Sequence, residues 1–196
     1  MDFGRTSLDR LAKLGRGVRS RRCSSYDTAG GNRDWWPVRA GETVVLADLK
    51  GAGMIRHIWM TTEEANHNLR ALALRMYWDG EETPSVQCPL GDFFGLGFGR
   101  PNYFVSLPLQ ASHLGMNCWF AMPFAKGARV TLTNDSERDT LIYFYIDWQE
   151  YDALPDDLGR FHANWRRELV VCKEEETGPN AAGRVQRLNR TGENNY

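Results

Sequence analysis

Between residues 43 and 148 the chain alternates short apolar runs with turn residues, and this pattern constrains the fold more than any other feature. In the run at 128–134, Ala128, Val130 and Leu132 alternate with polar or charged residues, which is typical of a strand with one buried face. The pattern predicts eight strands, at residues 43–48, 54–62, 69–78, 84–89, 103–108, 116–122, 128–134 and 140–148.

No helical repeat alternates with these strands, which excludes a doubly wound α/β fold. Strands spaced at about 8–12 residues, with turn residues between them, favour two packed sheets. We therefore expect an all-β fold, a single jelly-roll β-sandwich of about eight antiparallel strands. A short N-terminal helix is expected at residues 7–16, where Leu8, Leu11 and Leu14 form one apolar stripe.

The domain predicted from these elements spans residues 1–168. Beyond it the apolar pattern decays, because Lys173–Glu176 is a run of charges and residues 178–183 form a cluster of structure breakers. We expect residues 169–196 to be a divergent, mostly disordered tail.

The composition argues against nucleic acid and membrane as partners. Hydrophobic residues make up 42% of the 196 residues, charged residues 25%, and the net charge at pH 7 is -1, so no strong field attracts an anionic surface. Residues 1–22 are an exception, with seven Lys or Arg against two Asp. A nucleic-acid arm is one interpretation of this stretch, and the solvated face of a helix is the simpler one. Without a signal-peptide core or an apolar run of about 18 residues, a cytoplasmic location is expected.

The four cysteines do not have the spacing of a zinc site, so neither a metal nor another cofactor is expected. Cys88 and Cys118 fall in apolar, strand-like runs and are predicted to be buried thiols.

The segment Gly91–Gly99 is rich in glycine and resembles a phosphate loop at first sight. A phosphate loop requires a helix N-terminus after it, and the following Arg100-Pro101-Asn102 cannot start one, so we reject a nucleotide site. A structural crossover or a ligand-lining loop remains. Asp92 offers an acceptor beside the flat apolar rings of Phe93 and Phe94, which suits the hydroxyls and C–H faces of a sugar.

A second candidate is the polar loop that contains Asn32, Asp34, Trp35 and Trp36. Paired tryptophans can stack on a sugar ring, close the open end of a sandwich, or form a subunit contact. The sequence leaves these three roles open. Asp27 in the same loop has a simpler role as a support for its turns.

Glycoside hydrolysis usually requires two carboxyl groups, about 5–5.5 Å apart for retention and about 6.5–9.5 Å apart for inversion. The chain has many carboxyls, but the sequence singles out no pair. Asp79 is best explained by the hairpin turn Asp79-Gly80, and His57, placed between Ile55 and Trp59, is expected to be packed rather than catalytic.

Several runs in order are similar to one known family. They are residues 20–32, 41–59, 74–99, 117–126 and 161–168. Together they resemble glycoside hydrolase family 172 from about residue 5 to residue 168, in its N-terminal half.

The resemblance implies two tandem jelly rolls, assembly into homo-oligomers, and retaining hydrolysis of fructofuranosides or D-arabinofuranosides by two glutamates of the second jelly roll. This chain has no motif that matches those glutamates, so no catalytic residue is carried over. The matching loops imply that Asn32, Asp34, Trp35, Trp36, Asp92, Phe93 and Phe94 contribute to a sugar pocket or an interface.

The change of pattern after Glu168 suggests a frameshift or early stop in a gene for the complete enzyme. We therefore expect a truncated hydrolase that is inactive alone. The alternatives are an enzyme completed by a separately encoded second half, and a non-catalytic jelly roll that binds carbohydrate or assembles with itself. A lone half is expected to expose apolar surface and to self-associate.

Overall fold

The computed structural model describes residue 15 and residues 17–63, 69–170, 177–179, 185–187 and 192–195. The chain divides into two compact units, Met1–Asn164 and Trp165–Tyr196. The helix expected at residues 7–16 lies outside the described residues, apart from Gly15.

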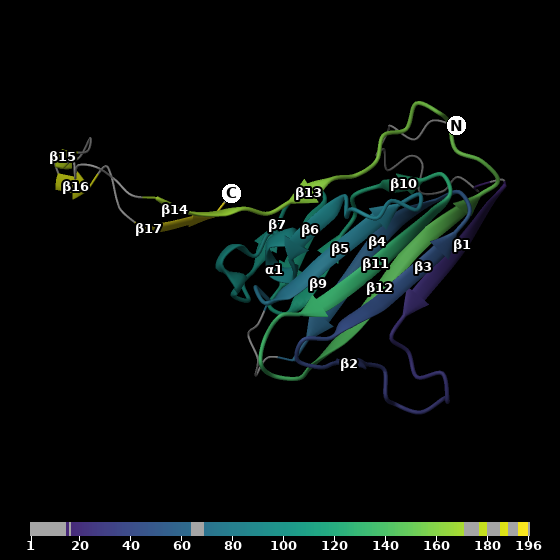
Figure 1. Ribbon diagram of the computed structural model, residues 1–196, viewed down its shortest axis with the longest axis horizontal. Helices are drawn as coiled ribbons and strands as arrows, with labels where there is room; N and C mark the ends of the chain where they lie inside the picture. Colours follow the sequence, from purple (N-terminus) through teal and green to yellow (C-terminus); the bar gives the residue numbers. More distant parts are fainter. Residues whose placement is uncertain are drawn as a thin grey trace. The chain divides into compact units, whose positions relative to one another are not determined.

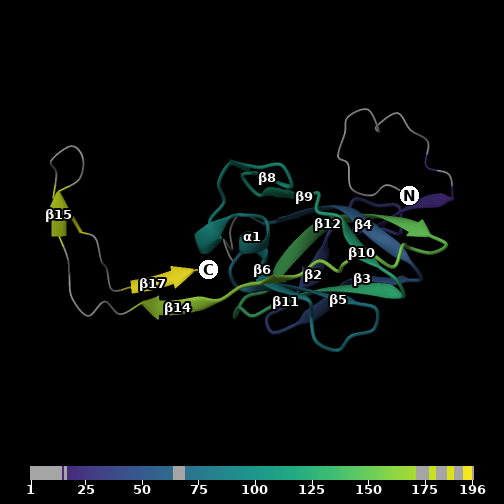
Figure 2. The same cartoon turned by 90° about the horizontal axis from the view of Figure 1, so that it is seen from above.

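The first unit consists of two sheets, which Figure 2 shows as separate layers. The larger has the order β1 (Val18–Ser24), β12 (Thr140–Tyr151), β4 (Gly53–Thr62), β9 (Gly115–Cys118), β8 (Leu109–Ser112), β7 (Phe104–Val105), with β2 (Trp36–Val38) on β12 and β10 (Met122–Phe124) on β4. The smaller has the order β13 (Ala163–Asn164), β6 (Val86–Pro89), β5 (Leu72–Trp78), β11 (Gly127–Asn134), β3 (Thr43–Lys50). A one-turn helix, α1 (Leu90–Phe93), follows β6 (Figure 1).

The connectivity is that of a jelly roll. The strands β1, β12, β4 and β9 form one four-stranded layer, and β3, β11, β5 and β6 form the other, so most successive strands change sheets. All pairs in the first unit are antiparallel except β13 with β6. The expected all-β sandwich is therefore confirmed, and β7 and β8 extend the larger sheet beyond β9.

The inner faces of the two sheets form the core, as the alternation predicted. Ala128, Val130 and Leu132 of β11 are buried, and so are Ile142, Phe144 and Ile146 of β12. Thr131 does not follow the predicted alternation, because it is buried where the pairing of β11 with β3 shifts register.

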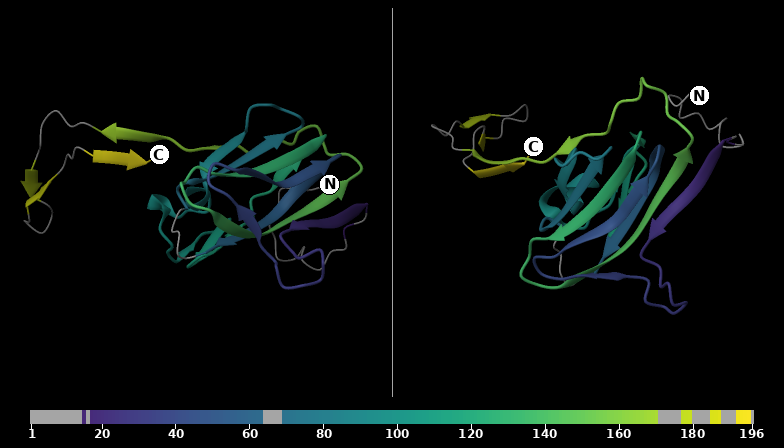
Figure 3. Two further views of the ribbon diagram at one scale, coloured as in Figure 1. Left: turned by 60° about the horizontal axis from the view of Figure 1, so that its bottom comes forward. Right: turned by 45° about the vertical axis from the view of Figure 1, so that its right-hand side comes forward.

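Each of the eight predicted runs contains a strand, although 116–122 divides into β9 and β10. Two strands lie outside the eight predicted runs at the N-terminal side: β1 continues to Ser24, and β2 begins at Trp36, which was expected in a loop. The strand β1 was not predicted because it lacks an apolar face. It is an edge strand (Figure 3) whose arginines pair with acids on β12, with Arg22 joined to Asp147.

The second unit contains two strand pairs: β14 (Arg167–Val170) with β17 (Gly192–Asn195), and β15 (Thr177–Pro179) with β16 (Val185–Arg187). The described segments beyond Glu168 are thus strands, and the expectation of a mostly disordered tail over residues 169–196 stays a prediction. Isolated two-stranded ribbons are marginally stable in water, so these pairs contribute little to the stability of the fold.

Two matched substitutions test the location of the core. Val130 is fully buried and Val45 is 40% exposed on the neighbouring strand β3. Val130→Ala removes two buried methyl groups, and we expect it to lower the free energy of unfolding by about 2 kcal/mol. Val45→Ala should change it by less than about 0.5 kcal/mol. Urea denaturation measures both, and equal losses would contradict the assignment of the inner faces.

Candidate functional site

The loop that contains Asn32, Asp34, Trp35 and Trp36 is held largely by its own acids. Asp34 accepts a hydrogen bond from the backbone N–H of Asp27 at 3.0 Å. Its carboxylate therefore stabilises the loop, while Asn32 is exposed.

Asp27 supports the turns of this loop, as predicted. Its carboxylate accepts hydrogen bonds from the N–H groups of Ala29, at 2.9 Å, and Arg33, at 3.2 Å. These bonds, led by the one from Ala29, hold the pKa of Asp27 below its ordinary value. A side chain at Gly31 would collide with this carboxylate, since a Cβ there would lie 2.6 Å from its Oδ2 atom.

The two tryptophans of the loop have different surroundings. Trp36 is half-buried and meets the ring of Phe144 edge-on, with centroids 5.0 Å apart, so it closes one end of the core. The guanidinium of Arg33 lies 4.8 Å from the ring centroid of Trp35 and covers one of its faces. The sequence left sugar stacking, closure of the sandwich and a subunit contact open for the paired tryptophans. The contact of Trp36 with Phe144 matches closure of the sandwich.

Asp92, Phe93 and Phe94 lie in and after α1. The carboxylate of Asp92 accepts two hydrogen bonds from Arg70, both at 3.0 Å, in a bidentate ion pair. Phe94 is fully buried and Phe93 nearly so, and their rings pack edge-on at 5.0 Å. Neither ring presents a face to solvent in this unit.

The two predicted clusters are not brought together: the 32–36 segment leads into β2, which pairs with β12, and α1 follows β6 near the other edge of the sandwich (Figure 1). The contacts of Asp92, Phe93 and Phe94 are those of a structural crossover, which was the alternative interpretation. Sugar binding by the seven predicted residues stays a prediction.

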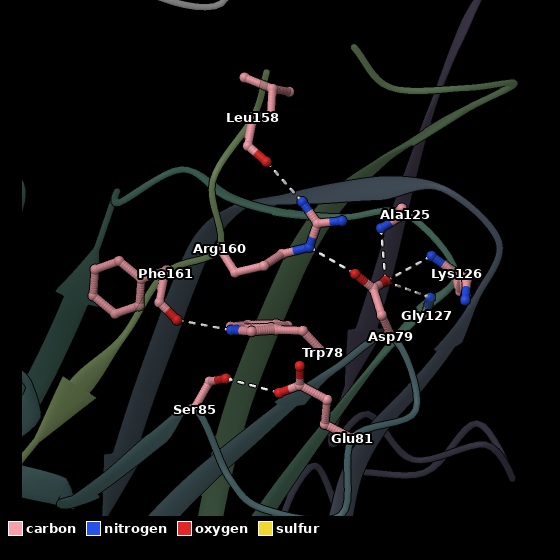
Figure 4. Close-up of polar contacts among 10 residues, drawn as sticks. All are labelled: Trp78, Asp79, Glu81, Ser85, Ala125, Lys126, Gly127, Leu158, Arg160 and Phe161. Atoms are coloured by element: carbon pink, nitrogen blue, oxygen red, sulfur yellow. Dashed lines mark hydrogen bonds and ion pairs between the residues drawn. The ribbon is translucent and has the colours of Figure 1, made fainter. Parts of the chain in front are cut away.

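Asp79 forms an anchor between three segments of the chain (Figure 4). It has a left-handed conformation, with φ of 58°, and its Oδ1 atom accepts hydrogen bonds from the N–H groups of Ala125, at 2.7 Å, and Lys126, at 2.6 Å. Its Oδ2 atom accepts a hydrogen bond from Nε of Arg160 at 2.6 Å. Burial alone would raise the pKa of Asp79, but the Lys126 N–H and the Arg160 guanidinium lower it below the ordinary value.

An open hollow of about 760 Å³ lies on the smaller sheet beside this anchor, lined in part by Asp79, Tyr77 and Arg129. Its size makes it an obvious place to look for a site. However, Asp79 is committed to hydrogen bonds that stabilise the fold, and the guanidinium of Arg129 lies 6.0 Å from the ring centroid of Tyr77. The ring of Tyr77 in this hollow is therefore partly covered by Arg129.

The outer face of the larger sheet gathers aromatic and polar side chains from four strands and an adjacent loop. Cross-strand register places Tyr145 opposite Trp59, Trp59 opposite Asn117, and Asp147 opposite His57. Directly opposed residues of an antiparallel pair project from the same face. The aromatic face, as we call this surface, consists of Arg22, His57, Trp59, Asn117, Trp119, Tyr145 and Asp147.

Its rings are stacked in two pairs. Trp59 and Tyr145 have centroids 5.0 Å apart and planes inclined by 30°. His57 and Trp119 have centroids 5.3 Å apart and planes inclined by 19°. Tyr145 is 39% exposed and Trp119 is 45% exposed, so both pairs present apolar surface to solvent.

A polar network runs between these rings. Asp147 accepts hydrogen bonds from Nε of Arg22 at 2.6 Å and pairs with Nδ1 of His57 at 3.1 Å. Nε2 of His57 lies 3.0 Å from Oδ1 of Asn117. Burial alone would raise the pKa of Asp147, but its hydrogen bonds with Arg22 and then His57 lower it below the ordinary value. His57 is thus held at both ring nitrogens, in agreement with the prediction of a packed residue.

At the border of this face, β1 is held to β12 by a further acid. Glu150 accepts hydrogen bonds from Arg19 at 3.0 Å and Arg21 at 2.9 Å. These bonds, led by the one from Arg19, lower the pKa of Glu150 to about 2. The basic side chains of β1 are therefore paired with acids, which neither interpretation of residues 1–22 anticipated.

Sequence reasoning missed the aromatic face because it is created by register between strands far apart in the chain. The signal was present only in part: alternation puts His57 and Trp59 on one side of their strand, and Tyr145 and Asp147 on one side of theirs. Which strands are neighbours, and which residues lie opposite each other, did not follow from the alternation.

The described part of the chain contains no group of three or more His, Cys, Asp or Glu side chains close enough to hold a metal ion. Cys88 and Cys118 are buried as predicted, and burial raises the pKa of each thiol to about 12. Among the described residues, no helix has the length and apolar character needed to span a membrane.

A family model described as GH172 domain-like matches residues 33–143, more than half of the chain, so the chain belongs to this glycoside hydrolase-related family. The match is consistent with the N-terminal half of the family and confirms the resemblance to family 172. No curated protein matches the chain.

The anchor at Asp79 makes a prediction about acid stability. Asp79→Asn removes the charge but keeps a residue type that tolerates a left-handed backbone. We expect it to lower the free energy of unfolding at pH 7 by about 1–3 kcal/mol. Because the folded-state pKa is lowered, the contribution of Asp79 is complete above the unfolded value of about 3.9 and is lost as pH falls through the folded value.

The difference between wild type and Asp79→Asn should therefore shrink below about pH 4, as measured by urea denaturation at several pH values. Asp48→Asn, at an exposed acid on β3, is the control and should cost less than about 0.5 kcal/mol. A constant difference from pH 7 to pH 3 would show that the charge of Asp79 is not responsible.

Proposed function

We propose that the jelly roll binds furanoside sugars on the aromatic face and does not cleave them by itself. The observation that carries the proposal is the alternation of stacked rings with a satisfied polar network on one exposed sheet face. Flat rings fit the C–H faces of a sugar, and neighbouring amide, imidazole and carboxylate groups fit its hydroxyls.

The sugar class rests on the family relationship. Because the chain belongs to a glycoside hydrolase-related family, fructofuranosides and D-arabinofuranosides are the first ligands to test. A furanose ring is small enough to lie on Trp119 while its hydroxyls reach Asn117 and Asp147. Tyr145 is less available, because Trp59 stacks on its ring and the guanidinium of Arg22 lies 4.4 Å from its ring centroid.

The ionisation of the acids supports the proposal that this unit does not cleave sugars by itself. Asp27, Asp79, Asp147 and Glu150 all have lowered pKa values because they accept hydrogen bonds from N–H groups or guanidinium groups. A general acid in glycoside hydrolysis requires a raised pKa so that it carries a proton near neutral pH. These four acids are held ionised, which suits contact with hydroxyls and does not suit proton donation.

A second candidate function follows from the family alone: a hydrolase whose catalytic glutamates come from a second jelly roll. In that case this unit supplies binding surface to a joint active site. Turnover of an aryl arabinofuranoside by the isolated chain would contradict the proposal that this unit does not cleave.

Substitution of single tryptophans tests the proposed site. Trp119→Ala removes an exposed ring of the aromatic face and should weaken binding of methyl α-D-arabinofuranoside or methyl fructofuranoside about fivefold, since a stacked ring contributes about 1 kcal/mol. Calorimetric titration of the intact chain measures the affinity.

Trp35→Ala makes the same change in the 32–36 loop and is the matched control, with no expected effect on affinity. The reverse result, loss of binding with Trp35→Ala alone, would move the site to the loop predicted from the sequence. No binding of either sugar to the wild-type chain would refute the proposal.

A further inference from the structure

The segment that follows α1 forms a small hollow of its own. The hollow measures about 330 Å³ and is lined by residues between Gly95 and Phe104, with Phe98, Arg100 and Tyr103 among them. Pockets that hold small molecules measure about 300–1,000 Å³, so this one is large enough for a single sugar unit. None of its lining residues belongs to the aromatic face or to the Asp79 anchor.

The backbone on one side of the hollow is held in place without a ligand. The N–H of Gly95 donates to the carbonyl of Asp92 at 3.1 Å, and the N–H of Leu96 donates to the carbonyl of Gly91 at 2.8 Å. Gly95 has a φ of 85°, and a Cβ there would lie 2.5 Å from the ring of Phe104, so this ring packs directly on the backbone. Since Gly95 and Phe104 both line the hollow, this part of its wall is preformed.

Phe98 has a conformation that is costly for a side chain of its size. Its φ of 69° and ψ of 7° lie in the left-handed region, which bulky residues rarely adopt. Burial does not offset this cost, because Phe98 is 75% exposed. Backbone strain of this kind is concentrated at ligand sites, where the surrounding structure holds a side chain in the position that the ligand needs.

Tyr103 supplies a second exposed ring to the hollow. It is 80% exposed, and its backbone N–H donates to Oδ1 of Asn102 at 2.8 Å. Within the described part of the chain, the amide nitrogen of Asn102 and the hydroxyl of Tyr103 have no hydrogen-bond partner. Two accessible rings beside uncommitted donors suit the C–H surface and the hydroxyls of a sugar.

Arg100 gives the hollow its charge. It is the one charged residue among the described residues that line the hollow, and residues 93–112 contain no Asp, Glu or Lys. The nearest acid in the sequence, Asp92, is bound by Arg70 in a bidentate pair, and no described carboxylate pairs with Arg100. A guanidinium binds a carboxylate or a phosphate through two parallel N–H bonds. The hollow therefore favours an anionic ligand over a neutral one.

We infer that this hollow binds a sugar unit that carries an anionic group, either a carboxylate or a phosphate. Arg100 pairs with the anionic group, the rings of Phe98 and Tyr103 contact the C–H surface of the sugar, and Asn102 donates to a hydroxyl. A uronic acid unit of a polysaccharide and a sugar phosphate share this chemistry. The inference does not depend on the proposed furanoside binding, because the two sites have no residue in common.

Calorimetric titration of the intact chain with three glucose derivatives tests the inference. Methyl β-D-glucuronide carries a carboxylate, glucose 6-phosphate carries a phosphate, and methyl β-D-glucoside is neutral. We expect at least one anion to bind about tenfold or more tightly than the neutral glucoside, with an affinity that falls as salt is added. Preference for the glucuronide would indicate a uronic acid unit, and preference for the phosphate a sugar phosphate. Equal affinity for all three, or no binding of either anion, would overturn the inference.

Substitution of Arg100 tests its role in that binding. Arg100→Gln removes the charge and keeps a polar side chain, and it should weaken binding of the preferred anion about tenfold or more and remove most of its salt dependence. Arg138→Gln makes the same change at an exposed arginine between β11 and β12 and should have no effect. Full affinity in Arg100→Gln, or an equal loss in Arg138→Gln, would contradict the assignment.

Phe98→Gly provides a second variant with a readout besides binding. It removes the ring and places glycine at the left-handed position, so it should weaken anion binding without lowering the free energy of unfolding in urea. A loss of stability would show that the exposed ring supports the fold, against the inference. Titration of Arg100→Gln with methyl α-D-arabinofuranoside should give the wild-type affinity, which separates failure of this inference from failure of the proposed function.

Discussion

The pairing of β12 with β4 is the interaction on which the rest of the structure depends. From one strand it supplies Ile142, Phe144 and Ile146 to the core, and from the opposite side of the same strand it supplies Tyr145 and Asp147 to the aromatic face. A slip of one residue in this register would exchange the two sets, burying a carboxylate and exposing the core. Stability of the sandwich and formation of the site are therefore consequences of the same ladder.

The acids of this unit illustrate a division between structural and chemical roles. Asp27 and Asp79 order turns, Asp92 joins α1 to Arg70, and Glu150 holds β1 at the edge of the sheet. Asp147 differs because it both pairs with Arg22 and borders exposed rings. A carboxylate in this position can accept hydroxyl hydrogen bonds without being displaced from its partners, since it has lone pairs beyond those used.

Local patterns were sufficient to predict the fold class and most strands. Period-two alternation in segments such as β11 results directly from the burial of one face of the strand. They failed for β1, where arginines replace apolar residues and the stabilising partners, Asp147 and Glu150, lie more than 120 residues away. They also did not predict the aromatic face. Phe93 and Phe94 resembled a sugar platform in sequence, but the crossover at α1 turns both rings into the core. Two rings of the aromatic face reach solvent: Tyr145 lies in β12 and Trp119 follows β9, and only the pairing of these strands through β4 brings them to one face.

The proposed function requires that a furanoside binds this protein on the aromatic face. The most direct measurement is an amide and indole N–H chemical-shift titration of the intact chain with methyl α-D-arabinofuranoside. We expect saturable shifts of the indole N–H groups of Trp59 and Trp119 and of the backbone around Asn117, with Trp35 and Asp92 unchanged. Shifts confined to Trp35 and Asp92, or none at all, would contradict it.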